Sequence, residues 1–448
     1  MQSFRLLLPE RIRLSLDTLH KAGFEAYVVG GCVRDTLLGL TPHDWDIATS
    51  APPDRIQEIF KNYRQIDAGL KHGTVMVRIG GETIEITTFR VDGHYSDGRR
   101  PDSVTFTPNL AEDLARRDFT VNACAATEDG LIDPFGGQRD AQNRLIRCVG
   151  EPQRRFEEDA LRILRGIRFS SVLDFEVDEK TKEAMYTCMP LLRNVSQERV
   201  TEELRKTLLG HAVKRTLLEY HAFIAFLIPE IEPTFHFEQH NTHHCFDVYT
   251  HTASAVGAAE QDILIRTALL FHDIAKPRCY TMTDDIGHFH GHQRLSADMT
   301  EAILKRMKFP AAEIRSITQL IEHHDTIFDP TERCVKRLLN RLGEMQLRRL
   351  LKIKRADILA QSPEYYDRLN ALDAMESLLE EILSSQDCVT LKELALNGTD
   401  LIEAGVPKGK MVGLLLDRLL GLVLDGRAEN TRAALLQELD WLMNTCSD

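Results

Sequence analysis

Three acidic residues in the N-terminal part have the types and spacing to hold divalent cations. Asp44 and Asp46 flank a tryptophan, and Glu85 lies in the strand-like run TIEITTF. In an extended segment, residues i and i+2 share one face, which puts the two aspartates about 7 Å apart along the backbone. Glu85 would add a third carboxylate from a neighbouring strand. Such a set suits Mg²⁺ and two-metal nucleotidyl or phosphoryl transfer.

A glycine pair stands at a predicted strand-to-helix junction. Gly30 and Gly31 follow the run AYVV and precede the helical pattern CVRDTLLG, which contains Arg34. Glycines there let backbone N–H groups approach a phosphate, and a helix N-terminus adds positive potential. Taken alone, the glycine pair indicates a tight turn between a strand and a helix. Together with the three carboxylates, it favours a triphosphate-binding site.

A second group of chemically active residues lies farther along the chain. Eleven of the seventeen histidines fall between His236 and His324, and a His-Asp doublet stands at His272-Asp273. Imidazole and carboxylate together suit divalent transition metals such as Mn²⁺, Ni²⁺ or Fe²⁺. Scattered histidines are more often ordinary surface or core residues, and this is what we expect of three of them: His288, His290 and His323.

The elements that must position these residues change character near residue 150. A helix is predicted over residues 1–20, and strand-like runs follow: AYVVGG, IDAG, TVMVRIGG and TIEITTF. Helical patterns alternate with these runs at Cys32–Leu38, Asp54–Phe60 and Asn109–Arg116. This mixture predicts an α/β domain up to about Val149. From Pro152 the pattern is helical almost to the C-terminus.

Composition and charge exclude several classes of protein. The 448 residues are 43% hydrophobic and 27% charged with net charge −13, which excludes a disordered or collagen-like chain. The most apolar stretch, Met411–Leu424, is too short and too charged to cross a membrane. The N-terminus has charges within its apolar part, unlike a signal peptide. Nine cysteines without a CxxC pair predict reduced thiols and a cytoplasmic location.

Local basic patches leave nucleic-acid binding open despite the acidic balance. Residues 333–355 contain nine Lys or Arg and one acid, Glu344. The run would follow an RNA backbone, or it forms a solvated helix face. Lys408 and Lys410, in the turn GVPKGK, are candidates for a phosphate contact at a helix start.

Six motifs occur in one order at compatible spacings: GGCVRDTLLG, HDWDIAT, GLKHGTV, ARRDFTVNA, DPFGGQRD and RRFEEDALRILRGIRF. This set resembles the class II tRNA nucleotidyltransferases, which comprise CCA-adding enzymes and bacterial poly(A) polymerases. The resemblance covers about residues 20–210 and continues more weakly beyond. It implies an α+β chain, with a polymerase-beta-like α/β head followed by an all-α body.

The resemblance assigns roles to matching positions in the head. Asp44 and Asp46 would bind Mg²⁺, and Glu85 would complete the catalytic carboxylates. The remaining nucleotide-binding candidates would contact the triphosphate, line the site or approach the ribose: Gly30, Gly31, Arg34, Arg117, Asp118 and Asn122.

A predicted helix carries the residues expected to select the base. Asp159 and Arg162 lie three apart and would share a helix face, offering acceptors and donors that imitate a base edge. In the family the matching pair reads C and A without a nucleic-acid template. Arg165 and Arg168 continue at the same spacing and would meet phosphates or support the pair. Outside the context of the family motif, the same three-residue spacing of acidic and basic residues would indicate an exposed row of salt bridges along a helix.

The segment between Arg90 and Arg116 is rich in Gly, Asp and Pro, which predicts a flexible loop. In the family a loop here is tied to the switch from C to A addition, and enzymes that add only C tend to lack it. Its presence favours full CCA activity or A addition, and GLKHGTV favours the CCA branch over the poly(A) branch.

The histidine-rich block resembles the HD phosphohydrolase superfamily. By that pattern, four residues would hold one metal: His251, His272, Asp273 and Asp357. His292 and His324 would hold a second metal, and Lys276 would lie near a phosphate. A metal there would activate water against a phosphoester such as a 2′,3′-cyclic phosphate or a monoester. A helical scaffold without chemistry is the alternative.

The resulting prediction is a CCA-adding enzyme that uses CTP, ATP, Mg²⁺ and tRNA, with no membrane and an undefined oligomeric state. Four parts are expected: a catalytic head (1–150), a base-recognition neck (151–225), an HD-type domain (226–375) and a tRNA-binding tail (376–448). Three alternatives remain: a poly(A) polymerase or A-only enzyme, a phosphohydrolase that uses the head only to hold RNA, and a tRNA-binding protein without activity.

Overall fold

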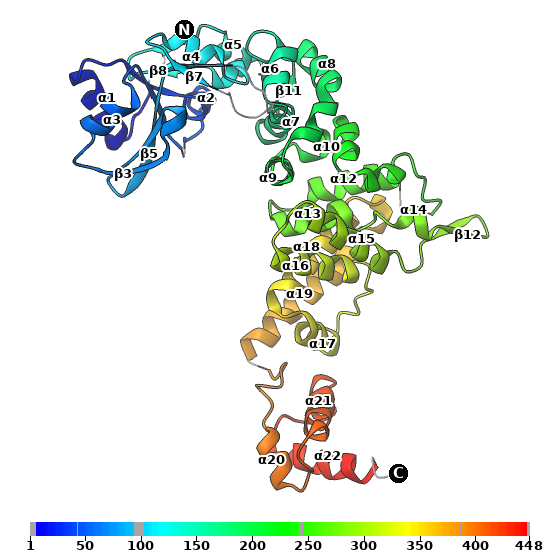
Figure 1. Cartoon of the computed structure of the whole chain (residues 1–448). Helices are drawn as coiled ribbons and strands as arrows, with labels where there is room; N and C mark the ends of the chain where they lie inside the picture. The colour runs from blue at the N-terminus through cyan, green and yellow to red at the C-terminus, as the bar shows by residue number, and fades with distance from the viewer. Residues whose placement is uncertain (1–5, 43, 94–102, 242–244, 386, 446–448) are drawn as a thin grey trace. The chain divides into compact units, whose positions relative to one another are not determined.

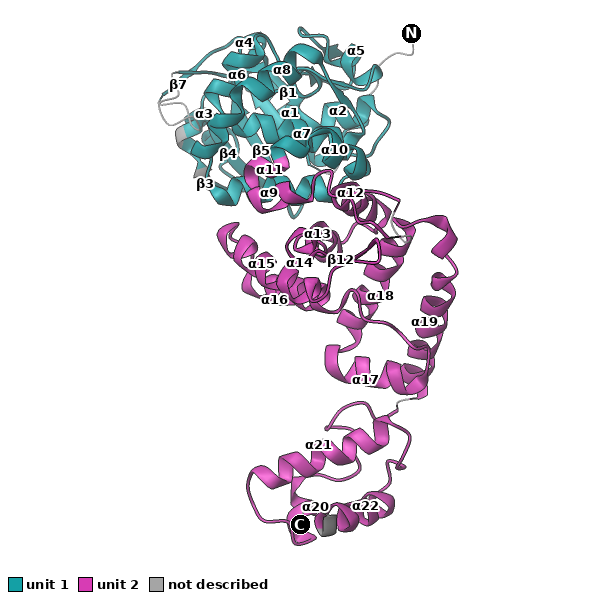
Figure 2. Ribbon diagram, turned by 90° about the vertical axis from the view of Figure 1, so that its right-hand side faces the viewer, with its two compact units in different colours: residues 1–223 teal, residues 224–448 magenta. Residues whose placement is uncertain are grey.

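The computed structural model describes residues 6–42, 44–93, 103–241, 245–385 and 387–445. The chain divides into two compact units, residues 1–223 and residues 224–448 (Figure 2). The first is a mixed head with helices after it, and the second is almost entirely helical, as the predicted α+β class requires (Figure 1). The finer division into four parts stays a prediction.

A seven-stranded sheet forms the centre of the head, in the order β3-β4-β5-β2-β1-β8-β9. Strand β2 runs parallel to β5, and the other neighbours are antiparallel. The strands span β1 Ala26–Val29, β2 Asp46–Thr49, β3 Arg64–Gly69, β4 Thr74–Ile79, β5 Glu82–Thr88, β8 Ala125–Ala126 and β9 Leu131–Ile132. Every strand-like run of the sequence is therefore a strand of this sheet.

Helices accompany the sheet within the head. Their bounds are α1 Glu10–Lys21, α2 Gly31–Leu37, α3 Pro53–Ile59, α4 Leu110–Ala115 and α5 Gly137–Gln142, with short turns η1 Leu70–His72 and η2 Thr120–Asn122. The helix expected over residues 1–20 begins only at Glu10. Pro9 lies at its N-cap in an extended conformation, and a proline also disfavours the helical region for the residue before it.

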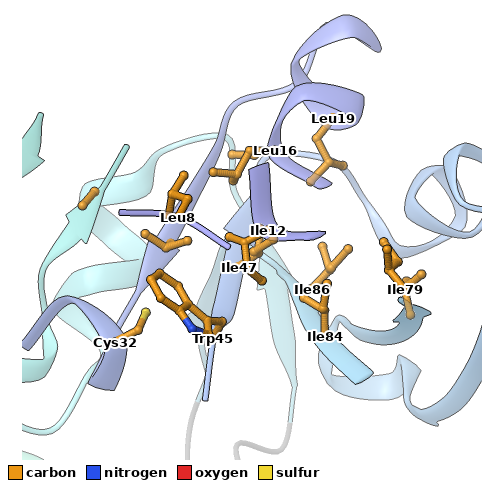
Figure 3. Close-up of a cluster of buried hydrophobic side chains, with 14 of the residues drawn as sticks. Leu8, Ile12, Leu16, Leu19, Cys32, Trp45, Ile47, Ile79, Ile84 and Ile86 are labelled. Atoms are coloured by element: carbon orange, nitrogen blue, oxygen red, sulfur yellow. The ribbon is translucent and has the colours of Figure 1, made fainter. Parts of the chain in front are cut away.

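Side-chain alternation along the strands gives the sheet two different buried faces. Val28, Ile47 and Ile86 join one apolar cluster, which includes α1 and Trp45 (Figure 3). Val29 and Ala48 join a second cluster with α4. Because successive residues point to opposite faces, Trp45 and Ile47 anchor β2 in the first cluster and leave the intervening Asp46 on the other face.

The predicted loop between Arg90 and Arg116 is partly ordered as strands. Strands β6 (Arg90–Asp92) and β7 (Val104–Phe106) form an antiparallel pair, and helix α4 follows. Residues 94–102, between the two strands in the sequence, lie outside the described residues. The prediction of a loop was therefore wrong for the flanking strands.

Helices complete the first unit. They span α6 Pro152–Glu158, α7 Leu161–Leu173, α8 Glu179–Cys188, η3 Met189–Asn194, α9 Gln197–Leu208 and α10 Val213–Glu219, with a small pair of strands, β10 Leu145–Ile146 and β11 Glu176–Val177. Helix α7 packs against α9. Helix α11 (His221–Leu227) crosses the boundary into the second unit.

The second unit holds one two-stranded sheet among its described residues, β12 Thr281–Thr283 with β13 Ile286–His288. Its helices are η4 Pro229–Thr234, α12 Val248–Ala258, α13 Ile263–Phe271, α14 Lys276–Cys279, α15 His292–Arg306, α16 Ala311–His323, α17 Glu332–Leu342, α18 Glu344–Leu359, η5 Pro363–Tyr365, α19 Arg368–Ser385, α20 Gly398–Glu403, α21 Lys410–Leu424 and α22 Arg432–Thr445.

Two expectations about chemistry and environment can be compared with the described residues. The eight cysteines among them are all free thiols. Over the same residues, no helix combines the length and apolar character that a membrane span requires.

Candidate functional site

A cavity of about 580 Å³ in the first unit brings together the candidate residues of the head. Every predicted head residue except Glu85 lines it. The lining also contains five residues that were not predicted: Asp35, Arg116, Leu161, Phe169 and Arg199. Seven arginines and five aspartates face this cavity. Clustered positive charge in a concave site attracts anions such as a triphosphate.

The three candidate catalytic carboxylates are positioned by the register of the sheet. Asp46 begins β2 and is the direct partner of Glu85 on β5, while Ile47 pairs with Ile86. Since Ile47 and Ile86 point into the first apolar cluster, Asp46 and Glu85 share the opposite face. Asp44 lies two residues before β2 and is exposed, like Asp46. Asp46 and Glu85 therefore share one face, as predicted, whereas Asp44 lies outside the strand and lines the same cavity as Asp46.

The three carboxylates are set apart rather than closed into a metal cage. The groups of closely spaced ligand atoms found among the described residues both lie in the second unit. The pKa of Asp46 is raised to about 6, first by desolvation and then by the negative charge of Glu85, with Arg117 acting against the rise. A divalent cation beside these acids would relieve the same repulsion, so the donor set suits Mg²⁺.

The glycine pair brings backbone and guanidinium groups together. Gly30 has φ +78°, and a Cβ there would lie 3.1 Å from Arg117 Nη1. Helix α2 begins directly afterwards and carries Arg34, whose Nη1 donates to Asn122 Oδ1 at 2.8 Å. A side chain at position 30 would be strained and would crowd Arg117. The backbone at this junction is therefore open toward the cavity.

A buried carboxylate connects the nucleotide-binding motif to helix α7. Asp118 accepts from Arg165 Nε at 2.6 Å, from Asn122 Nδ2 at 3.2 Å and from the backbone N–H of Phe119 at 2.8 Å. Burial alone would raise its pKa, but the Arg165 guanidinium and these hydrogen bonds lower the pKa of Asp118 to about 2. Arg165 thus holds a fixed place in the cavity wall.

An Asp118→Asn variant is expected to unfold more easily by about 2 kcal/mol at pH 7, because the depressed pKa reports stabilisation of the ionised group. This stabilisation is present above the unfolded-state pKa near 4 and is lost as pH falls toward 2. The difference between wild type and variant should therefore shrink below pH 4. Chemical denaturation at pH 7, 4 and 3 measures it, and a constant difference would contradict the assignment.

The predicted base-reading pair does not share one helix face. Asp159 has φ −146° and ψ 102° at the end of α6, and α7 begins only at Leu161. The Asp159 side chain accepts from the Leu161 N–H at 3.1 Å, so it competes with the helical backbone and breaks the helix. Asp159 and Arg162 both line the cavity, but no ion pair joins them.

Each member of the pair is held by a different partner. Arg162 Nη1 donates to Glu158 Oε2 at 2.9 Å, and its Nη2 donates to the backbone carbonyl of Arg116 at 3.0 Å. Asp159 is bound by Arg199 of α9. Sequence reasoning missed Arg199, because residues 40 positions apart have no spacing rule that predicts contact.

Phe169 was also missed, since its position matches an ordinary core residue. Its ring lies within 5.5 Å of three guanidinium carbons, those of Arg34, Arg165 and Arg168. Arg168 in addition donates to Glu203 at 2.7 Å. Aromatic faces attract cations, so the ring keeps like-charged arginines close together beside the cavity.

Four imidazoles and two carboxylates converge in the second unit. His251 and His272 meet at 3.3 Å between their Nε2 atoms, and Asp357 Oδ1 lies 2.9 Å from His251 Nε2. On the other side, His292 and His324 are 3.3 Å apart, also Nε2 to Nε2. The histidine cluster, as we name it, thus contains all six predicted ligands: His251, His272, Asp273, His292, His324 and Asp357.

Asp273 lies between the two halves of the histidine cluster. Its Oδ2 is 3.2 Å from His272 Nε2, and its Oδ1 is 3.3 Å from His292 Nε2. Both oxygens are buried without a hydrogen bond among the described residues, although the Lys276 ammonium is 2.7 Å from Oδ2. Buried carboxylate oxygens without hydrogen bonds are costly, and a divalent cation would compensate for both.

Backbone hydrogen bonds orient three of the imidazoles toward this centre. The Nδ1 atoms of His272, His292 and His324 each lie 2.7 Å from a backbone carbonyl three residues earlier. This arrangement leaves Nε2 free to coordinate, as is usual at metal sites. The electrostatics of the cluster also favour a cation. Burial of His272 opposes its protonation, yet the negative charges of Asp273 and Asp357 raise the pKa of His272 to about 10. Positive charge is therefore favourable here.

The other predicted residues of this unit lie outside the cluster or beside it. Lys276 is buried and donates to Gln239 Oε1 at 2.7 Å. His288 and His290 stack on one another, and neither they nor His323 belong to a group of closely spaced ligands among the described residues. Lys408 and Lys410 are exposed.

The basic run of residues 333–355 is largely neutralised in this structure. Arg333 and Arg337 both pair with Asp425, and Lys352 pairs with Glu260. Lys354 is buried and donates to the carbonyls of His324 and Thr326. These contacts favour the alternative of an ion-paired helix surface over a free phosphate-binding stripe.

Comparison with known proteins decides the family. Residues 26–147 match the family described as "Poly A polymerase head domain", residues 174–235 match "Probable RNA and SrmB- binding site of polymerase A", and residues 292–439 match the second domain of tRNA nucleotidyltransferases. The CCA-adding enzyme of Levilactobacillus brevis is 36% identical over 439 residues, covering 96% of this chain and 98% of that protein. The chain belongs to the CCA-adding enzyme family.

Solved structures agree with this membership of the CCA-adding family. The Bacillus stearothermophilus CCA-adding enzyme in complex with CTP is 31% identical, with a TM-score of 0.74 over 98% of this chain and 99% of that one. The Thermotoga maritima CCA-adding enzyme complexed with tRNA has a TM-score of 0.59 over 99% and 100% of the two chains, at 22% identity, and shows the fold alone. This CCA-adding family member is therefore an enzyme, a nucleotidyltransferase, as predicted.

Proposed function

We propose that the protein adds CCA to tRNA 3′ ends from CTP and ATP, without a nucleic-acid template. The observation that carries this proposal is the cavity, in which Asp44, Asp46, the glycine turn and the Asp159–Arg162 pair line one space. The CTP complex of the Bacillus stearothermophilus relative supports it. We place the protein in the cytoplasm, where its predicted reduced cysteines would persist.

Different side chains of the cavity have different roles in the proposed nucleotidyl transfer. Asp44 and Asp46, with Glu85 beside them, would hold Mg²⁺, which supplies charge neutralisation for the triphosphate and activates the attacking hydroxyl. The cavity arginines and the Gly30–Gly31 turn bind the triphosphate, which orients the α-phosphate toward the tRNA 3′-hydroxyl. Asn122, held by Arg34, lies near the expected ribose. Pyrophosphate leaves after each addition.

Base choice would come from Asp159 and Arg162. Cytosine and adenine both present an exocyclic amino donor, whereas uracil and guanine present a carbonyl oxygen there. An aspartate accepts from the amino group, and an arginine donates to the neighbouring ring nitrogen. The pair thereby favours C and A.

The direct test uses purified protein, Mg²⁺ and two tRNA transcripts, one that lacks CCA and one that ends in CC, with CTP and ATP separately and together. Products are resolved to single nucleotides. Growth by three residues, ending in A and stopping there, is expected. Long A tails would instead assign a poly(A) polymerase, and addition of a single A to tRNA ending in CC, without C addition, would assign an A-only enzyme. Absence of any extension would refute nucleotide addition.

A second activity is favoured by the histidine cluster. We propose that it holds one or two divalent transition metals and hydrolyses phosphoesters such as 2′,3′-cyclic phosphates or phosphate monoesters at RNA ends. The buried Asp273 carboxylate between two pairs of imidazoles supports this proposal. When bound there, a metal would supply activation of water. Lys276, 2.7 Å from Asp273, would lie near the phosphate.

A further inference from the structure

The orientation of Asp159 in the cavity depends on a contact with helix α9, 40 residues farther along the chain. Arg199 of α9 binds it with two parallel hydrogen bonds, Nη2 to Oδ2 at 2.8 Å and Nη1 to Oδ1 at 3.3 Å. The side chains are 23% and 16% exposed, so solvent competes little for either partner. Two-point arginine–carboxylate pairs fix geometry as well as supply energy. The plane of the Asp159 carboxylate is therefore fixed by Arg199.

The hydrogen bonds already made limit what Asp159 can still accept. A carboxylate has about four acceptor sites. Arg199 occupies two of them, and the Leu161 N–H occupies a third at 3.1 Å. About one remains for a ligand in the cavity. A single fixed acceptor discriminates sharply between an amino group and a carbonyl oxygen, because the wrong base leaves two acceptors facing each other.

We propose that Arg199 is the positioning residue that sets base specificity, by fixing the Asp159 carboxylate so that it accepts from C or A and rejects U and G. The inference rests on the proposed function, in which Asp159 reads the base. Without Arg199 the carboxylate can rotate about its side-chain bonds. A rotated carboxylate no longer presents one defined acceptor, so selection weakens more than triphosphate binding does.

Two variants and one control test this role. Arg199→Gln removes the positive charge and the two parallel N–H donors. Arg199→Lys keeps the positive charge but lacks the planar guanidinium that donates two parallel hydrogen bonds. Lys206→Gln is the control, since Lys206 is on the same helix, exposed, and paired only with Glu202 at 3.1 Å in the described structure. For each protein, kcat/KM is measured for CTP and UTP on tRNA lacking CCA. Thermal unfolding shows whether each variant folds.

The ratio of kcat/KM for CTP to that for UTP should fall roughly tenfold to hundredfold in both Arg199 variants, the range expected when one bidentate contact to a base is lost. Lys206→Gln should keep the wild-type ratio. Equal losses for CTP and UTP in the Arg199 variants, or a wild-type ratio in Arg199→Gln, would overturn the proposal, because a purely structural role lowers both rates together.

Asp159→Ala separates this inference from the proposed function. If Asp159→Ala loses discrimination while Arg199→Gln retains it, only the role of Arg199 is wrong. If Asp159→Ala discriminates like wild type, the base-reading assignment itself fails. If wild-type protein does not incorporate CTP, the proposed function fails before either question arises.

Discussion

Replacing Asp46 with Asn is expected to lower nucleotide addition by roughly 10³-fold while leaving the protein folded. Removing a carboxylate that would hold Mg²⁺ takes away several kcal/mol of charge stabilisation in the transition state, and each ~1.4 kcal/mol is a factor of ten in rate. The measurement is the rate of CTP incorporation into tRNA lacking CCA under single-turnover conditions. This is the largest effect we expect of a single change in the head.

Stability separates this loss from misfolding. The raised pKa of Asp46, about 6, means that the ionised carboxylate is unfavourable in the metal-free folded state. The penalty is absent below the unfolded-state pKa near 4, and it grows as pH rises through 6. Asp46→Asn should therefore unfold at a higher temperature than wild type at pH 7 in chelator, with a smaller difference at pH 4.

Asp54→Asn is the matched control for this experiment. Asp54 is exposed in the first turn of α3 and does not line the cavity. It should keep wild-type activity. Wild-type incorporation by Asp46→Asn would refute the assignment of Asp46, and so would lost activity in an Asp46→Asn protein that is also less stable at pH 7.

Replacing Asp273 with Asn should prevent metal binding by the histidine cluster and lower its rate of phosphoester hydrolysis by roughly 10³-fold. The rate of CCA addition should stay at the wild-type value. Asp273 lies between both imidazole pairs, so its loss affects both halves of the cluster. Metal content per chain and release of phosphate from a 2′,3′-cyclic nucleotide are the measurements.

A second experiment covers the case in which this buried substitution prevents folding. Wild-type protein is treated with chelator and then supplied with Mn²⁺, Ni²⁺ or Mg²⁺ separately. Hydrolysis should disappear and return with one of the transition metals. His288→Gln is the matched control, because His288 lies outside the cluster. Hydrolysis that persists in chelator-treated protein would contradict a metal site.

The sequence predicted the strand-like runs of the sheet and the common face of Asp46 and Glu85, because both follow from alternation. In TIEITTF the apolar residues Ile84 and Ile86 flank Glu85, and the same pattern surrounds Asp46. The candidate histidine ligands were predicted through resemblance rather than geometry. Their convergence depends on the packing of α12, α13, α15, α16 and α18, which no local pattern in the chain specifies.

The helix break at Asp159 could not be predicted from periodicity. Phe156, Ala160 and Ile163 are all buried and keep a helical spacing across the break, so the apolar pattern continues where the backbone does not. The Leu161 N–H donates a hydrogen bond to the Asp159 side chain, and the backbone at Asp159 is extended instead of helical. The contact with Arg199 depends on the packing of α7 against α9, which is a tertiary feature.

The alternation in β2 also determines which genetic changes this segment can tolerate. Trp45 and Ile47 are buried in the apolar cluster, and Asp46 between them points to the opposite face. A substitution changes one side chain, but a one-residue insertion or deletion exchanges the two faces of the strand. It would move Asp46 into the apolar cluster and turn Ile47 toward the opposite face. A change in the length of this segment therefore disturbs both faces of the strand at once, whereas a substitution alters only one side chain.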